Sequence, residues 1–223
     1  MPEPIQCRNL TFARPQSPAV LTDITVTFHP GRIALIMGPT GAGKTSLLLL
    51  LAGIHRPSTG EIAAGEKNIS RWRTPHLDRW RRRVGIAFQH PALLSGLSVL
   101  ENVMLPLIPR AMGVSALRKQ SLLALERLGI TALAGESVDA LSGGQRQRVA
   151  LARALAADPS VVIADEPTAH QDDQGVVTVT AALASAASAG ATVIVAAHDP
   201  RLRGPGFAAD RYRLCNGHLE MAT

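Results

Sequence analysis

The sequence predicts an α/β fold built around a mostly parallel β-sheet. Three short apolar segments without polar alternation support this prediction, at residues 33–37, 161–164 and 192–195. Runs of this kind are typical of strands buried on both faces of a sheet. Segments of helical composition alternate with them, at 46–52 and 177–189. The alternation of strands and helices favours parallel pairing.

A glycine-rich loop follows the first apolar strand. Its eight residues are Gly-Pro-Thr-Gly-Ala-Gly-Lys-Thr, which match the phosphate-loop pattern G-x-x-x-x-G-K-[ST]. Glycines allow backbone N–H groups to face an anion, and the start of the following helix adds partial positive charge. Lys44 would reach the β and γ phosphates of a nucleoside triphosphate, and Thr45 would give Mg²⁺ a hydroxyl ligand. The residues expected to bind the nucleotide here are Gly38, Pro39, Thr40, Gly41, Ala42, Gly43, Lys44, Thr45 and Ser46.

Two carboxylates, Asp165 and Glu166, end the second apolar strand. In open parallel sheets, ligands bind at the carboxyl ends of the strands. We expect Asp165 to hold Mg²⁺ and Glu166, which projects the opposite way, to activate a water molecule against the γ-phosphate. The alternative is a pair of solvated acids at a strand end.

The middle of the chain predicts helices. Ser98 and Glu101 form a capping box at one helix start, and residues 115–128 form an amphipathic pattern that ends at Gly129. A third helix is expected at 146–157.

The two ends of the chain predict antiparallel strands. They are expected up to about residue 30 and around a hairpin turn at Asn216-Gly217. With 46% hydrophobic residues, the 223-residue chain can form a single domain, 1–223, with a helical subdomain of about 91–157 inserted in its core.

A second glycine segment, Leu141-Ser142-Gly143-Gly144-Gln145, precedes the helix at 146–157. The Ser142 hydroxyl and the N–H groups after it could bind a phosphate oxygen. A helix cap that binds nothing explains the same residues. Taken alone, the segment favours the simple helix cap.

Positive charge is concentrated in one segment. The chain has a formal net charge of +6, and both tryptophans lie within this basic segment. Its residues are Arg71, Trp72, Arg73, Asp78, Arg79, Trp80, Arg81, Arg82 and Arg83. An amphipathic helix beginning at Thr74-Pro75, with a solvated arginine face, is the favoured interpretation. A partner or membrane surface, or a nucleic-acid site, are the alternatives.

Compartment signals indicate a reducing environment. Cys7 and Cys215 lack C-x-x-C spacing, so neither a disulfide framework nor a zinc site is expected. The first residues lack the features of a signal peptide. Residues 176–197 carry no charge, but Gly190 divides them into an alanine-rich helix and a strand, so a membrane span is not expected.

These motifs, in this order, resemble the ATP-binding subunit of ABC transporters over essentially the whole chain. The resemblance implies that Ser142, Gly143, Gly144 and Gln145 contact the ATP held by the phosphate loop of a second copy. It also implies that Gln89 senses Mg²⁺ and water near the membrane subunits, and that His198 contacts the γ-phosphate. Glu166, His198 and Lys44 are then the catalytic residues.

Two departures from the family pattern concern the base and the dimer interface. Arg14 stands where the family usually has an aromatic residue that stacks on adenine, and Phe12 is a possible substitute. After the glutamate, Asp172 matches the family loop that lies at the dimer interface and joins the ATP site. His170 and Gln171 differ from the family there, so communication between the two sites is expected to differ.

The resemblance implies a homodimer, or a paired cassette, that closes on two ATP and two Mg²⁺ and drives separate integral membrane subunits. Such a protein is cytoplasmic and peripheral on the cytoplasmic face of the cell membrane. Local sequence around Glu101 and Asp165 is most similar to the branch of lipoprotein-releasing and macrolide-exporting ATPases, which includes a cell-division regulator. Signalling without transport is therefore the alternative function. A nucleic-acid or ribosome-acting ATPase is less favoured, and no nucleic-acid partner is expected.

Overall fold

The computed structural model describes residues 3–204 and 206–222 of the chain, and its strands form two sheets. The larger sheet has six strands in the order β10-β9-β3-β8-β7-β6. Their bounds are β3 Ile33–Met37, β6 Val84–Ala87, β7 Val161–Asp165, β8 Thr192–Ala196, β9 Asp210–Cys215 and β10 His218–Met221. All adjacent pairs are parallel except β10 with β9, which the Asn216-Gly217 turn joins as a hairpin. The predicted mostly parallel sheet and the terminal turn are confirmed.

The second sheet is antiparallel and has the order β2-β1-β4-β5. Its strands are β1 Ile5–Ala13, β2 Ala19–Phe28, β4 Thr59–Ala64 and β5 Lys67–Asn68. The prediction that antiparallel structure ends near residue 30 was too short, because β4 returns to pair with β1. Gly60 permits this approach, since a Cβ there would lie 2.2 Å from the Asn9 carbonyl oxygen.

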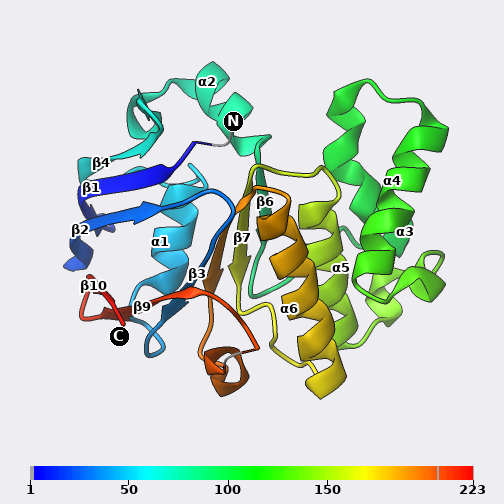
Figure 1. Ribbon diagram of the computed structural model, residues 1–223. Coiled ribbons are helices and arrows are strands. Elements are labelled where there is room, and N and C mark those ends of the chain that lie inside the picture. The colour runs from blue at the N-terminus through cyan, green and yellow to red at the C-terminus, as the bar shows by residue number, and fades with distance from the viewer. Residues whose placement is uncertain (1–2, 205, 223) are drawn as a thin grey trace.

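Alternate residues of the parallel strands face two separate cores. Leu35 packs on the side of α5 (Gly143–Leu155) and α6 (Asp173–Ser188), whereas Ile36 packs on the side of α1 (Lys44–Leu51). Figure 1 shows α1 between the antiparallel strands and the parallel sheet, and α5 and α6 beyond the opposite face. The apolar strands lack polar alternation because both of their faces are covered.

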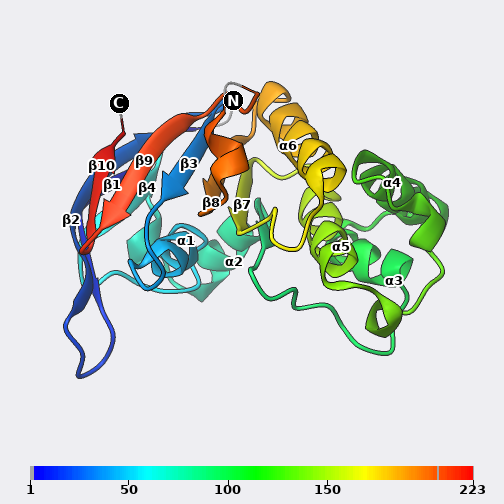
Figure 2. The same cartoon turned by 90° about the horizontal axis from the view of Figure 1, so that it is seen from below.

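The helical segment lies between β6 and β7 in the sequence, and these two strands pair with each other. It contains α3 (Val99–Met104), the 3₁₀ turn η2 (Leu105–Arg110), α4 (Val114–Arg127) and then α5. Figures 1 and 2 place α3 and α4 beside α5, away from the antiparallel sheet. The predicted capping box at Ser98 is present, and the predicted 115–128 helix is displaced by one residue.

Helix α2 (Thr74–Arg81) lies at the centre of the basic segment and carries Arg79 and Arg81. It begins one residue earlier than expected, with Arg73 at the N-cap and no side-chain cap hydrogen bond. Leu77 and Trp80 are buried, and the Trp80 indole Nε1 donates to the Leu51 carbonyl at 3.1 Å. Remaining 3₁₀ turns are Ile69–Arg71 (η1), Thr131–Leu133 (η3), Val138–Ala140 (η4) and Pro200–Arg203 (η5).

The uncharged segment at 176–197 divides as expected into the end of α6 and strand β8. Among the helices within 3–204 and 206–222, none has the length and apolar character needed to cross a membrane.

Candidate functional site

The carboxyl ends of four adjacent parallel strands, β3, β8, β7 and β6, meet at one edge of the large sheet. Each end carries a predicted site residue. The phosphate loop follows β3, His198 follows β8, Asp165 and Glu166 end β7, and Gln89 follows β6. The edge is where open parallel sheets bind ligands.

The phosphate loop curls around the Lys44 ammonium. The Lys44 Nζ donates to the Gly38 carbonyl at 2.8 Å and to the Pro39 carbonyl at 3.1 Å. Gly41 and Gly43 have φ values of 82° and 101°, which other residues rarely adopt, and a Cβ on Gly38 would lie 2.2 Å from the Leu214 carbonyl oxygen. Gly43 offers the first turn of α1 no side-chain cap, so N–H groups of that turn suit an anion. The loop therefore fits a phosphate group.

A hydroxyl and a carboxylate meet beside the loop. The Thr45 Oγ1 donates to the Asp165 Oδ2 at 2.6 Å, and Asp165 is 4% exposed. The pKa of Asp165 is raised, mainly by burial; the Thr45 hydrogen bond opposes this rise, the adjacent Glu166 charge adds to it, and the Lys44 charge opposes it. A cation beside these oxygens would favour the ionised carboxylate.

Within the described ranges, no group of three or more His, Cys, Asp or Glu side chains is arranged to hold a metal ion. Mg²⁺ commonly binds through one or two protein oxygens and takes its other ligands from substrate phosphates and water. The Thr45 and Asp165 oxygens fit that mode of binding.

Glu166 is hydrogen-bonded to the end of β8 and contacts His198. Its φ of 50° is unusual for this residue type, and its N–H donates to the Ala196 carbonyl at 2.8 Å. The Glu166 Oε1 lies 2.8 Å from the His198 Nδ1, and the Oε2 accepts from the His198 N–H at 3.3 Å. Glu166 is buried, which excludes the alternative of a solvated strand end. Two residues that are distant in sequence thus form one acid–imidazole pair.

Gln147 is a site residue that the sequence reasoning missed. It is buried within α5, and its Nε2 donates to the Phe88 carbonyl at 3.2 Å and lies 3.5 Å from the Glu166 carbonyl oxygen. It thus connects the segment leading to the exposed Gln89 with the end of β7. A signal existed, because Gln147 shares a helix face with the buried Ala150 and Leu151.

Ser142 caps α5. The Ser142 N–H donates to the Gln145 Oε1 at 2.8 Å, and the Gln145 N–H donates to the Ser142 Oγ at 3.3 Å, which completes a capping box. The buried Gln171 donates from its Nε2 to the Gly144 carbonyl at 2.8 Å. Figures 1 and 2 place the start of α5 on the side of α3 and α4, apart from the loop between β3 and α1. The residues Ser142–Gln145 are therefore not brought to the phosphate loop of their own chain.

Asp172 also has a structural role. It is the N-cap of α6, and its Oδ1 accepts from the Gly175 N–H at 2.8 Å. Replacing Asp172 with alanine should lower the free energy of unfolding by about 1 kcal/mol, which shifts the melting temperature of a chain of this size by roughly 2–4 °C. Thermal unfolding without nucleotide tests this. Asp172→Asn, which keeps a capping oxygen, should have a melting temperature close to that of the wild type. An unchanged melting temperature in the alanine variant would show that the cap contributes nothing to stability.

The two residues considered for contact with adenine differ in accessibility. Phe12 is buried and stacks on His55, with the ring centres 5.6 Å apart and an interplanar angle of 13°. Arg14 is exposed in the turn between β1 and β2, where its carbonyl accepts from the Ser17 N–H at 3.1 Å. Figure 2 shows this turn extending beyond the sheet. The suggestion that Phe12 substitutes for a stacking residue is not supported by this packing.

A phosphate loop, a hydroxyl–carboxylate pair and a buried glutamate at one sheet edge define the class of phosphate-loop nucleoside triphosphatases. The family model of ABC transporters matches residues 21–169. The chain belongs to the ABC transporter family and is an ATPase cassette of that family. The predicted fold class is thereby confirmed.

Curated relatives agree with this assignment. An uncharacterized ABC transporter ATP-binding protein of Mycobacterium tuberculosis is 44% identical over 182 residues, which cover 80% of this chain and 54% of that protein. The cell division ATP-binding protein FtsE of Escherichia coli is 37% identical over 199 residues, which cover 87% of this chain and 88% of FtsE. The chain thus spans about half the length of the mycobacterial relative and most of FtsE.

Solved structures share the complete fold. The ABC transporter cassette MJ0796, described as dimeric, has a TM-score of 0.90 and 31% identity, and the match covers 97% of this chain and 96% of that chain. A post-hydrolysis dimer of MJ0796 bound to ADP and Pi also has a TM-score of 0.90, with 30% identity and coverage of 97% and 98%.

Proposed function

We propose that this cassette binds ATP with Mg²⁺, hydrolyses it as a homodimer and drives separate membrane-spanning subunits. The observation that carries the proposal is the shared sheet edge, where Lys44, the Thr45–Asp165 pair and the Glu166–His198 pair come together. Triphosphate binding, metal binding and water activation need these three chemistries side by side.

In this mechanism the side chains at the sheet edge divide the work among them. Lys44 and the loop N–H groups would hold the β and γ phosphates, while Thr45, Asp165 and Gln89 would hold Mg²⁺. The bound Mg²⁺ supplies positive charge that offsets the charge developing on the phosphates. Glu166 orients the attacking water and accepts its proton, and His198 fixes the Glu166 carboxylate and contacts the γ-phosphate.

The second copy completes the site. The residues Ser142–Gln145 lie apart from the loop of their own chain, and α5 begins there with N–H groups suited to an anion. The dimers reported for MJ0796 support assembly as a dimer, and in the arrangement that we propose each α5 start faces the other copy's nucleotide. Asp172 lies in the adjoining loop and is expected at the same interface.

A mixed-dimer experiment tests this arrangement. Lys44→Ala disables a phosphate loop, and Gly143→Arg blocks an α5 start at a position where the nearest neighbours of a Cβ are side-chain atoms of His170, 3.5 Å or more away. Each variant alone should be inactive, whereas their mixture forms dimers with one intact composite site and should regain ATPase activity, measured as phosphate release. Full activity of either variant alone, or no recovery in the mixture, would contradict the shared site.

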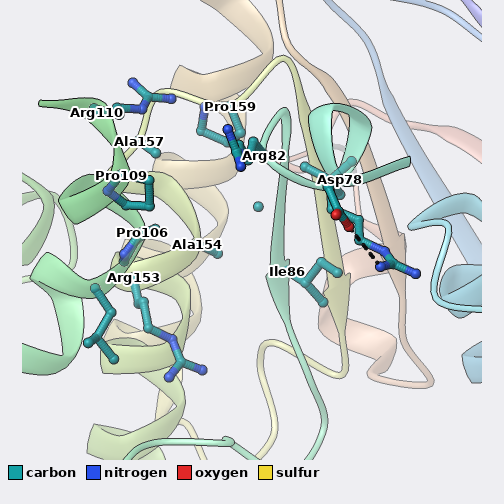
Figure 3. Close-up of a pocket in the computed structure, with 14 residues that line it drawn as sticks. Asp78, Arg82, Ile86, Pro106, Pro109, Arg110, Arg153, Ala154, Ala157 and Pro159 are labelled. Carbon is teal, nitrogen blue, oxygen red and sulfur yellow. Dashed lines mark hydrogen bonds and ion pairs between the residues drawn. The ribbon is translucent and has the colours of Figure 1, made fainter. Parts of the chain in front are cut away.

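A groove between α2 and α5 is the surface that we propose for a partner. A cavity of about 660 Å³ lies between α2 with β6 on one side and η2 with α5 on the other. Figure 3 shows apolar groups such as Ile86 and Pro106 on its walls, and Arg82, Arg110 and Arg153 around them. We infer that membrane subunits bind here, and we propose that the cassette lies on the cytoplasmic face of the membrane.

The relation to FtsE favours a second candidate, in which the ATPase transmits a signal through a membrane partner and moves no substrate. Copurification after detergent extraction separates these functions from a nucleic-acid role. An integral membrane protein in the complex supports the first two, and RNA or DNA that is lost with salt supports the third.

A further inference from the structure

We propose that a pocket on the outer side of α2 binds the phosphate head group of an anionic lipid and lays this helix against the membrane surface. The pocket has a volume of about 480 Å³. Its lining residues are Lys67, Trp72, His76, Arg79, Trp80 and Arg83. The proposal goes beyond ATP hydrolysis and partner binding, because the cassette itself then contacts lipid.

The charge of this pocket is uncompensated. Three cations line it, and none of its lining residues is acidic. Some exposed arginines elsewhere in the described chain pair with carboxylates, as in Arg8–Glu61 at 3.0 Å and Arg32–Asp210 at 2.7 Å, whereas no such pair is formed by the three cations of this pocket. Across α2 only Asp78 is available, and it pairs with Arg81, which lines the other cavity. A bound anion would relieve the mutual repulsion of the pocket's cations.

The two tryptophans of the pocket are held in fixed positions by the surrounding structure. Trp80 is 2% exposed and held by its hydrogen bond to the Leu51 carbonyl, and the Arg83 guanidinium lies 5.8 Å from the centre of its ring. Trp72 is half-buried, and Arg56 donates from Nη2 to its carbonyl at 3.0 Å. The partly exposed Trp72, beside Lys and Arg, is of the kind favoured at the boundary between water and bilayer, whereas the buried Trp80 fixes the pocket in place.

The position of α2 favours a lipid over a nucleic acid. Asp78 and Arg82 on the inner side of the helix line the groove inferred above for a membrane partner, so that partner would bring α2 next to the bilayer. The pocket is a single cavity, which fits one head group. A nucleic-acid strand needs a basic groove that follows several phosphates.

Vesicle sedimentation tests the proposal on the full chain. The wild type should bind vesicles of equimolar phosphatidylglycerol and phosphatidylcholine, release them as salt is raised, and show little binding to phosphatidylcholine alone. Lys67→Gln with Arg79→Gln should lower binding to the anionic vesicles about thirtyfold, because each cation near such a surface contributes about 1 kcal/mol. The matched control is Arg118→Gln with Lys119→Gln, two exposed cations on α4, and it should bind like the wild type.

Three results of the vesicle and RNA binding assays would overturn the proposal. They are equal binding to neutral and anionic vesicles, equal losses in the two double variants, and retention on polyuridylate RNA that depends on Lys67 and Arg79 while vesicles are not bound. Calorimetry with inorganic phosphate separates the sources of the anion, since binding of phosphate without vesicle binding also contradicts a lipid ligand. Lys67 and Arg79 do not lie at the sheet edge proposed to bind ATP. A failure of the lipid-binding test therefore leaves the ATPase proposal standing.

Discussion

Glu166→Gln should lower the rate of ATP hydrolysis by about 10²–10⁴-fold, the usual contribution of a positioned general base. Glutamine keeps the size of the side chain and can still accept a hydrogen bond from the His198 N–H, which lies 3.3 Å from the present carboxylate. It lacks the basic oxygen that takes a proton from water. ATP binding should survive because the phosphate loop is untouched.

Two measurements are needed for this variant. Phosphate release gives the rate, and calorimetry gives the affinity for ATP with Mg²⁺. In addition, a variant that binds without hydrolysing should accumulate as an ATP-dependent dimer in light scattering. Glu126→Gln removes an exposed carboxylate from α4 and serves as the control, with wild-type turnover expected. Wild-type turnover in Glu166→Gln would remove Glu166 from the catalytic role.

Lys44→Ala should act on binding instead. Hydrogen bonds to a charged group contribute about 1.5–3 kcal/mol each, so the loss of the ammonium predicts ATP affinity weaker by roughly 10- to 100-fold. The change should leave the fold intact, because the two recorded partners of the Lys44 Nζ are loop carbonyls, and α1 is anchored through its buried leucines.

Calorimetry of Lys44→Ala with ATP measures that loss. Lys119→Ala, an exposed lysine on α4, is the matched control and should bind ATP as the wild type does. Unchanged affinity in the Lys44 variant would contradict the assignment of the 38–45 loop to phosphate binding. Thermal unfolding without nucleotide should show similar melting temperatures for both variants.

Local sequence patterns predicted which residues lie at the sheet edge, because these residues belong to a complete motif or directly follow an apolar strand. The phosphate loop is complete in sequence, and Asp165 and Glu166 directly follow an uninterrupted apolar strand. What the sequence could not provide was the pairing of Glu166 with His198, since that contact depends on β7 and β8 being neighbours. Strand order is a property of the assembled sheet.

The misses have similar causes. The return of β4 to the antiparallel sheet depends on a partner about 50 residues away, and its small residues give no alternation that would predict it. Gln147 was overlooked because a single glutamine in a basic helix is an ordinary surface residue until its face is known to be buried. Phe12 was considered for base stacking because its actual partner, His55, is distant in sequence, so their contact could not be predicted from local patterns.

Helix α5 takes part in three regions that the proposed function keeps distinct. Its first turn carries Ser142–Gln145, Gln147 contacts the backbone at Phe88 and approaches that of Glu166, and Arg153 and Ala154 near its end line the groove. Thirteen helical residues span about 20 Å at 1.5 Å per residue. A helix of this length is stiff, so if its start faces a second copy as proposed, a shift there must also displace the groove wall. One continuous helix, α5, thus links the proposed nucleotide contact at its start to the proposed partner groove at its end.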